Sequence, residues 1–316
     1  MATVANDITC LYLAAQNGSI RSVTQLAEVG ELDLLHKTTL DGCTCLYIAS
    51  QQGHLDVVQD LIARSPELLH ITAAAHNDFS CLHIACQHGH LDVAEALAKA
   101  GGAALLQLPA RTRRTCLHVA CEYGHTDIVE MLIREGGEAL LHLRTEDDSS
   151  ALLCACREGH AHVAAALLQH GGEGQLGSPG ADRCMREACR RGHAGVVEAL
   201  LEGGGEALLS GSGRTGDGDG GSCLEAACGG GHIGVVRVLL GAMGPALLGR
   251  APTEAGACLR AACGGGHADV ARALLGAAGR SGRAGLRRAR RACLAAACRR
   301  GQAGLVLALL GGGGPA

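Results

Sequence analysis

Aromatic side chains are almost missing from this chain of 316 residues. It has no Trp, a single Phe at position 79 and three tyrosines, Tyr12, Tyr47 and Tyr123. A hydrophobic core must therefore be built from Leu, Ala, Val, Ile and Cys. Such small aliphatic side chains suit thin, closely spaced layers better than one thick globular core.

Lysine is nearly absent as well, since only Lys37 and Lys99 accompany 25 arginines. The formal net charge of -4 hides a gradient along the chain. Residues 276–316 carry eight Arg and no Asp or Glu, so residues 1–275 carry -4 minus 8, which is -12. The charge is polarised between the two ends, and clustered arginine attracts polyanions.

Long apolar runs are missing too. No apolar stretch reaches the roughly 18 residues that a membrane-spanning helix needs. Residues 1–10 show neither the basic start nor the apolar segment of a secretory signal. We therefore expect an intracellular protein, cytoplasmic or nuclear, without a membrane partner, whose 17 cysteines are reduced thiols.

Sequence motifs of catalysis are either missing or lack their context. No Lys follows a Gly, which excludes a P-loop, and there is no H-E-x-x-H or G-x-S-x-G. GSGRTG at 211–216 has no predicted strand before it and no helix after it. GDGDGG at 216–221 would need Glu at position 228 to form a calcium loop, and Cys228 stands there. We expect no enzyme, no cofactor and no metal site.

What the chain does have is an internal repeat. SCLHIACQHGH at 80–90 and TCLHVACEYGH at 115–125 align without a gap, and seven further segments align with them. The shared glycine of the nine copies falls at positions 18, 53, 89, 124, 159, 192, 231, 266 and 301. A period near 35 residues that fills the chain is typical of a solenoid.

Each copy contains the signals of a helix pair. A Thr or Ser can cap the first helix, and the shared glycine can take the positive φ that ends it. The segments that follow, such as LDVVQDLIA at 55–63, have apolar residues at helical spacing and predict a second helix. One such unit cannot bury its own apolar faces, but a stack can.

This pattern resembles the ankyrin repeat, whose first helix usually reads T-P-L-H-x-A-A-x-x-G-H. The matching residues of one copy are Thr115, Leu117, His118, Ala120, Gly124 and His125. The resemblance covers nearly the whole chain and implies an all-α ankyrin-repeat solenoid of stacked helix-turn-helix units with projecting loops. It also implies that the seven histidines that directly follow a turn glycine hydrogen-bond backbone across the turn and in the neighbouring repeat.

Two departures from the ankyrin pattern stand out. Cys replaces the usual Pro in eight of the nine copies, and most periods are 35 residues rather than 33. The extra residues precede the next cap, so we expect long fingertip loops with the Leu pair of segments like GGEALL (136–141) packed against the stack.

The quality of the repeats declines along the chain. We expect a better-patterned block of repeats 1 to 6 at 1–202, a Gly-rich loop at 203–221, and a degenerate block of repeats 7 to 9 at 222–316, rich in Gly, Ala and Arg. Gly-rich segments lower helix propensity, so the loop is the expected hinge.

The Cys and His residues of SCLHIACQHGH raise the question of a metal site. At 100° per residue, Cys81, His83, Cys86 and His88 point in directions that cannot form a tetrahedral ligand set. Equivalent cysteines of neighbouring repeats are expected to lie too far apart for disulfides. Fifteen of the 17 cysteines occupy two slots of the repeat, and we interpret them as small packing residues.

The concave face of a solenoid is its usual binding surface. The two polar residues before each turn glycine are expected to line this face, and we call the following set the recognition stripe: Gln16, Asn17, Gln51, Gln52, Gln87, His88, Glu122, Tyr123, Arg157, Glu158, Arg190 and Arg191. Tyr123 is the expected hot spot because aromatic residues dominate interface energetics. The loop tips are expected to add residues 76–79, then Arg111, Arg113 and Arg114, and then residues 146–148.

The sequence therefore predicts a non-catalytic scaffold that binds an unidentified protein partner through the stripe and the loop tips. The alternative is polyanion or nucleic-acid binding, or nuclear targeting, through the Arg-rich residues 280–300. No aromatic residue interleaves these arginines to stack on bases. We interpret 280–291 itself as a solvated loop tip.

Overall fold

The structure, a computed structural model, describes residues 8–175, 180–204, 222–243, 252–277 and 282–311. The chain divides into two compact units, residues 1–158 and 159–316. Most of the Gly-rich loop, 205–221, lies outside the described residues, so the hinge and the two sequence blocks stay predictions. Within the described ranges no strand forms, and one isolated antiparallel bridge joins Ala73 and Phe79.

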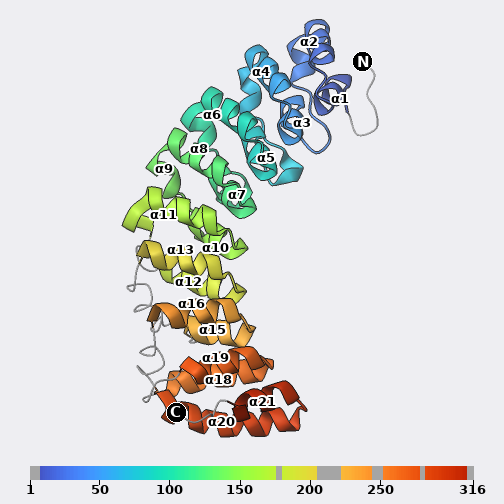
Figure 1. The fold of residues 1–316 in the computed structure, drawn as a ribbon. Coiled ribbons are helices and arrows are strands. Elements are labelled where there is room, and N and C mark those ends of the chain that lie inside the picture. Colours follow the sequence, from blue (N-terminus) through green and yellow to red (C-terminus); the bar gives the residue numbers. More distant parts are fainter. Residues whose placement is uncertain (1–7, 176–179, 205–221, 244–251, 278–281, 312–316) are drawn as a thin grey trace. The chain divides into compact units, whose positions relative to one another are not determined.

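The first unit consists of paired helices and short 3-10 turns. Its elements are α1 (Cys10–Gln16), α2 (Ile20–Leu35), α3 (Cys45–Gln52), α4 (Leu55–Arg64), η1 (Pro66–His70), η2 (Ala74–His76), α5 (Cys81–His88), α6 (Leu91–Leu106), η3 (Arg111–Arg113), α7 (Cys116–Tyr123), α8 (Thr126–Gly136), α9 (Glu138–Leu141) and α10 (Ala151–Glu158). The first helices α1, α3, α5, α7 and α10 pack in one row, and α2, α4, α6 and α8 pack in a second row (Figure 1).

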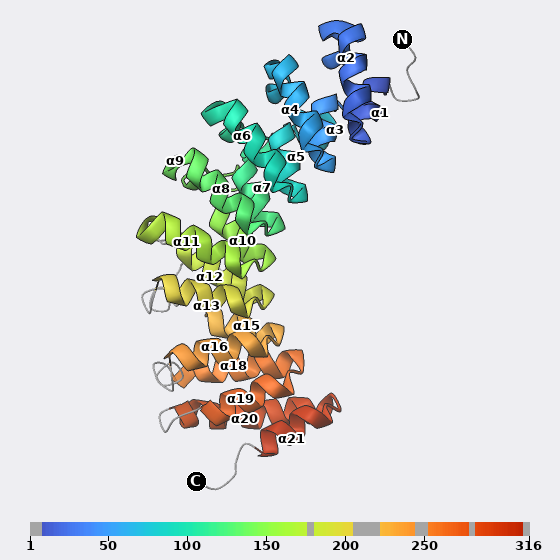
Figure 2. The same cartoon turned by 45° about the horizontal axis from the view of Figure 1, so that its top comes forward.

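The second unit repeats this arrangement. Its helices are α11 (Ala161–Gln175), α12 (Gly180–Arg191), α13 (Ala194–Gly204), α15 (Cys223–Gly230), α16 (Ile233–Met243), α18 (Pro252–Gly265), α19 (Ala268–Ala277), α20 (Gly282–Arg299) and α21 (Ala303–Gly311). One row runs α12, α15, α18 and α20, and the other runs α11, α13, α16, α19 and α21 (Figure 2). Each unit is thus a helical repeat stack, which confirms the all-α solenoid.

The caps and turns follow the sequence signals. The hydroxyls of Thr9, Thr44, Ser80, Ser150 and Ser222 each accept the backbone N–H three residues ahead. All nine shared glycines have positive φ, between 68° and 87°. Such φ values favour glycine because it has no Cβ.

A histidine of the next repeat covers most of these turns. A Cβ built on Gly89 would lie only 2.6 Å from Cε1 of His125. The Nε2–H of His125 in turn donates to the carbonyl oxygen of Gln87 at 3.1 Å. The turn glycine is therefore required both by its φ and by the ring that packs on it.

Where Thr or Ser is missing from the cap position, the first helix begins earlier than expected. Helices α12, α18 and α20 run through Arg183, Ala257 and Ala292, the positions aligned with the caps. The interpretation of 280–291 as a loop tip is therefore wrong from residue 282 onward, because α20 begins there. Without a side chain that competes for the first backbone N–H groups, the Arg- and Ala-rich sequence continues the helix.

The core contains the residues that the repeat predicts. Leu140 and Leu141 of GGEALL are buried, as are the equivalent pairs Leu68–Leu69 and Leu105–Leu106. Of the 17 cysteines, 15 are buried, and Cys10 and Cys298 are exposed. Packing is the role of most thiols, as expected from their two slots.

Candidate functional site

The recognition stripe lies at the C-terminal ends of first helices and in the residues just after them. In the first unit, six stripe residues are exposed and four are half-buried: exposed are Gln16, Asn17, Gln52, His88, Tyr123 and Glu158, and half-buried are Gln51, Gln87, Glu122 and Arg157. Both members from the second unit, Arg190 and Arg191, are exposed. Side chains of this set are therefore available on the surface of each unit.

Histidines of the following repeats hold the backbone of the stripe. The Nε2–H groups of His54, His90 and His125 donate to the carbonyl oxygens of Gln16, Gln51 and Gln87 at 3.0, 2.9 and 3.1 Å. In the second unit, His232 donates to the carbonyl oxygen of Arg190 at 2.9 Å. The same bond thus recurs at one register position, which confirms the cross-repeat role implied for these histidines.

Two side chains of successive repeats also meet on the stripe. The amide Nε2 of Gln87 donates to the hydroxyl oxygen of Tyr123 at 2.8 Å. Tyr123 is 46% exposed and is one of five large apolar or aromatic side chains exposed among the described residues. The neighbouring His88 ring bonds the carbonyl oxygen of Ile84 at 3.1 Å. These bonds fix the orientation of the Gln87 amide, the Tyr123 ring and the His88 ring on the surface.

The charged end of the stripe in the first unit surrounds a small pocket of about 150 Å³. It is lined by Thr112, Arg114, Glu122, Thr145, Asp147, Ser149, Cys154, Arg157 and Glu158. Arg114 forms an ion pair with Glu122, and Arg157 lies 3.9 Å from the Asp147 carboxylate. The repeat pattern does not predict that Thr112, Thr145, Ser149 and Cys154 share this surface, because separate repeats contribute them.

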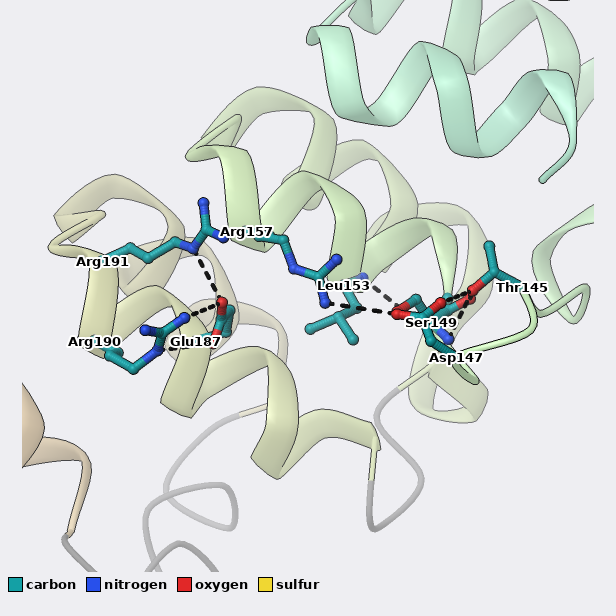
Figure 3. A network of polar contacts seen from close by, with 9 residues as sticks. Thr145, Asp147, Ser149, Leu153, Arg157, Glu187, Arg190 and Arg191 are labelled. Atoms are coloured by element: carbon teal, nitrogen blue, oxygen red, sulfur yellow. Dashed lines mark hydrogen bonds and ion pairs between the residues drawn. The ribbon is translucent and has the colours of Figure 1, made fainter. Parts of the chain in front are cut away.

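Asp147 is the centre of this polar network (Figure 3). Its carboxylate accepts hydrogen bonds from the hydroxyls of Thr145 and Ser149. These bonds, first from Thr145 and then from Ser149, lower the pKa of Asp147 to about 2. The group therefore stays charged at every physiological pH.

The stripe arginines of the second unit are not free cations. Arg190 contacts the Glu187 carboxylate through Nη2 at 2.7 Å and through Nε at 3.1 Å. Arg191 reaches the same carboxylate through Nε at 3.0 Å (Figure 3). Hydrogen bonding by Arg190 is the main cause that lowers the pKa of Glu187. The three side chains together present one net positive charge.

The loop tips of the first unit form a hydrogen-bonded row. The backbone N–H of residues 75, 111 and 146 donates to the carbonyl oxygens of Asp41, Asn77 and Thr112, at 3.2, 2.8 and 3.0 Å. One residue named for the tips, Phe79, is not at the surface: it is 7% exposed and its ring stacks on His83. The only Phe of the chain therefore packs beneath the loop tip.

The buried histidines His83 and His118 have structural surroundings, as expected from their place near the caps. Their Nδ1 atoms lie 2.8 Å from the hydroxyls of Ser80 and Thr115. The Nε2–H of His83 donates to the carbonyl oxygen of Arg114 in the next repeat. Burial lowers the pKa of both imidazoles to about 4, so they are neutral near pH 7.

Thiols of different slots meet between repeats. Cys86 neighbours Cys116, and Cys189 neighbours Cys223. The repeat period relates only equivalent slots, so it does not predict these pairs, and all these thiols are free. Within the described ranges, no group of three His, Cys, Asp or Glu residues could hold a metal ion. Nor is any described helix long and apolar enough to cross a bilayer.

Comparison with known families agrees with the repeat geometry. A family model described as ankyrin repeats, in three copies, matches residues 11–107, 65–142, 82–178 and 117–206. No curated protein matches the chain. Together with the capped helix pairs, the nine positive-φ glycines and the His-to-carbonyl bonds between repeats, the match over most of the chain shows that it belongs to the ankyrin repeat family.

Proposed function

We propose that this chain is a non-catalytic scaffold that binds a partner protein through the recognition stripe and the adjoining loop tips. Ankyrin repeats are generally protein-interaction modules and are typically non-enzymatic. The observation that carries the proposal is the row of stripe residues whose carbonyl groups are held by histidines of the next repeat. A row fixed in this way presents varied side chains at constant spacing, which is what recognition of one partner requires.

Tyr123 is the proposed anchor of this surface. Its ring is exposed, its hydroxyl accepts a hydrogen bond from Gln87, and its neighbour in the chain, Glu122, lines the charged pocket. Exposed aromatic residues contribute large contact areas at small entropy cost. A partner that buries the ring therefore gains more from this position than from the amides around it.

The experiment that tests the proposal is affinity capture from cells with the full chain, followed by quantitative mass spectrometry. Tyr123→Ala removes the anchor, and Glu130→Ala on the exposed side of α8 is the matched control. We expect one set of partners to be lost with the first variant and retained with the second. Equal capture by both variants contradicts the proposal.

The alternative of polyanion or nucleic-acid binding through residues 280–300 is supported by exposed charge alone. The described part of that segment has exposed arginines on α20 but no aromatic side chain that could stack on bases. Exposed charge attracts any polyanion, so it does not by itself favour nucleic acid.

A further inference from the structure

The last helix pair has a strongly basic surface. Arg287, Arg288, Arg291 and Arg299 of α20 are exposed, and Arg300 in the following turn is exposed too. No Asp or Glu occurs between residues 276 and 316. This surface belongs to the second unit and is separate from the ten stripe residues of the first unit.

The arginines share one side of α20. The opposite side, with Leu286, Ala289, Cys293 and Ala297, is buried, and α20 packs on α18 and α21. At 100° per residue, positions 287, 291, 288 and 299 span roughly 120° of the helix surface. Their guanidinium groups therefore point away from the packed side and can act together.

These charges are not neutralised within the described residues. Arg287, Arg288 and Arg291 form no ion pair or hydrogen bond there, and Arg300 donates only to the carbonyl oxygen of Gly264 at 3.1 Å. Arg299 likewise bonds a carbonyl oxygen, that of Ala295 at 3.3 Å. A carbonyl oxygen accepts the hydrogen bond but leaves the positive charge unbalanced.

Exposed leucines accompany the arginines. Leu307 and Leu310, one turn apart on α21, are 68% and 57% exposed. Arg290 of α20 donates to the carbonyl oxygen of Leu310 at 3.1 Å, which ties the basic helix to the end of α21. The terminal pair therefore has exposed cationic side chains on α20 and exposed apolar side chains on α21, and the bond between Arg290 and Leu310 joins the two helices.

From this combination we propose that α20 and α21 bind an acidic amphipathic segment of a partner protein. Its carboxylates would pair with the arginines, whose planar guanidinium groups accommodate carboxylates in bidentate geometry. Its apolar side chains would cover Leu307 and Leu310. A nucleic acid would pair with the arginines but would leave Leu307 and Leu310 uncovered. A second copy of the chain would place arginines opposite arginines, and like charges repel.

The test is fluorescence anisotropy of the full chain with a labelled helical peptide that has Glu on one face and Leu on the other. A peptide of the same composition in scrambled order, single-stranded poly(dT) and heparin are the comparison ligands. We expect the amphipathic peptide to bind best. Arg287→Glu with Arg291→Glu should weaken its binding by about tenfold or more.

The control is Arg237→Glu with Arg272→Glu, two exposed arginines of the same unit on α16 and α19. This pair should change the affinity by less than about twofold, since surface charges away from a contact act weakly. Leu307→Gln with Leu310→Gln should lower the affinity for the amphipathic peptide but leave the affinity for heparin unchanged. Circular dichroism confirms that each variant is folded.

Three results overturn the inference. Equal binding of the scrambled peptide, or stronger binding of poly(dT), indicates a surface that responds to charge alone. Unchanged affinity after the Arg287 and Arg291 reversals excludes this face. If the chain sediments as a dimer and Leu307→Gln converts it to a monomer, the leucines contact a second copy of the chain instead of a partner peptide. Tyr123→Ala should not affect the peptide, so this surface and the stripe succeed or fail separately.

Discussion

Gln87 and Tyr123, 36 residues apart in the sequence, are joined by a hydrogen bond of 2.8 Å between the amide nitrogen and the phenolic oxygen. The bond links the exposed ends of α5 and α7. It joins two residues of the recognition stripe directly, and it orients the one aromatic ring of that surface.

Tyr123→Ala and Tyr123→Phe separate the ring from its hydroxyl. If the ring is the anchor, Tyr123→Ala weakens binding of a captured partner by about tenfold or more, whereas Tyr123→Phe costs only the bond to Gln87, about threefold. Isothermal titration calorimetry with the purified partner measures both. A larger loss for Tyr123→Phe than for Tyr123→Ala would assign the binding to the hydroxyl instead.

Acid should destabilise the first unit through its buried histidines. Burial lowers the pKa of His83 and His118 to about 4 in the folded protein, compared with 6.5 in the unfolded chain, so the unfolded chain binds more protons between these pH values. Stability is complete above pH 6.5 and falls as the pH is lowered toward 4, by roughly 3 kcal/mol for each imidazole.

Urea unfolding followed by tyrosine fluorescence measures this dependence, because all three tyrosines lie in the first unit. His83→Gln, which keeps a polar side chain that does not titrate, should reduce the loss of stability between pH 6.5 and 4.5. A pH dependence identical to that of the wild-type chain would show that His83 does not bear on it.

Gly89→Ala should destabilise more than Gly301→Ala. Both glycines end a first helix with positive φ, 76° and 68°, which costs a non-glycine residue about 1 to 2 kcal/mol. At Gly89 the new methyl group also meets the His125 ring, whereas no atom of the described residues lies within 4 Å of a Cβ at Gly301. Thermal unfolding by circular dichroism should give the lower midpoint for Gly89→Ala, and equal midpoints would mean that the ring moves aside at no cost.

Cys10 and Cys298 should react first with iodoacetamide in the native protein. They are the two exposed cysteines, whereas burial raises the pKa of Cys45 and Cys81 to about 12 and so suppresses their thiolates. Peptide mass spectrometry after brief alkylation should find these two modified and the others only after unfolding. Early modification of Cys86 or Cys116 would indicate that the stack opens between these repeats.

Limited proteolysis should cut first between Gly203 and Gly221. This segment has nine glycines and contains Arg214, a site for trypsin, between the two predicted blocks. A brief digest should release an N-terminal fragment of about six repeats, because neighbouring repeats in a stack support one another whereas a weak interface frays first. Digestion at equal rates along the chain would contradict the predicted hinge.

The sequence by itself determined the repeat. Each cap hydroxyl bonds a group three residues ahead, and each turn glycine acts through its own φ, so a pattern of eleven residues is enough to place them. The sequence also predicts the burial of the Leu pairs, because they recur at one position of the repeat and can be covered only by packing against the stack.

Only the tertiary structure decided which side chains meet across repeats. Gln87 with Tyr123, Cys86 with Cys116 and the pocket around Asp147 join residues that lie far apart along the chain or in separate elements, and their contacts depend on how each helix pair is rotated on the next. The repeat period determines where each helix recurs along the chain, whereas the packing of neighbouring repeats determines which side chains meet at the surface.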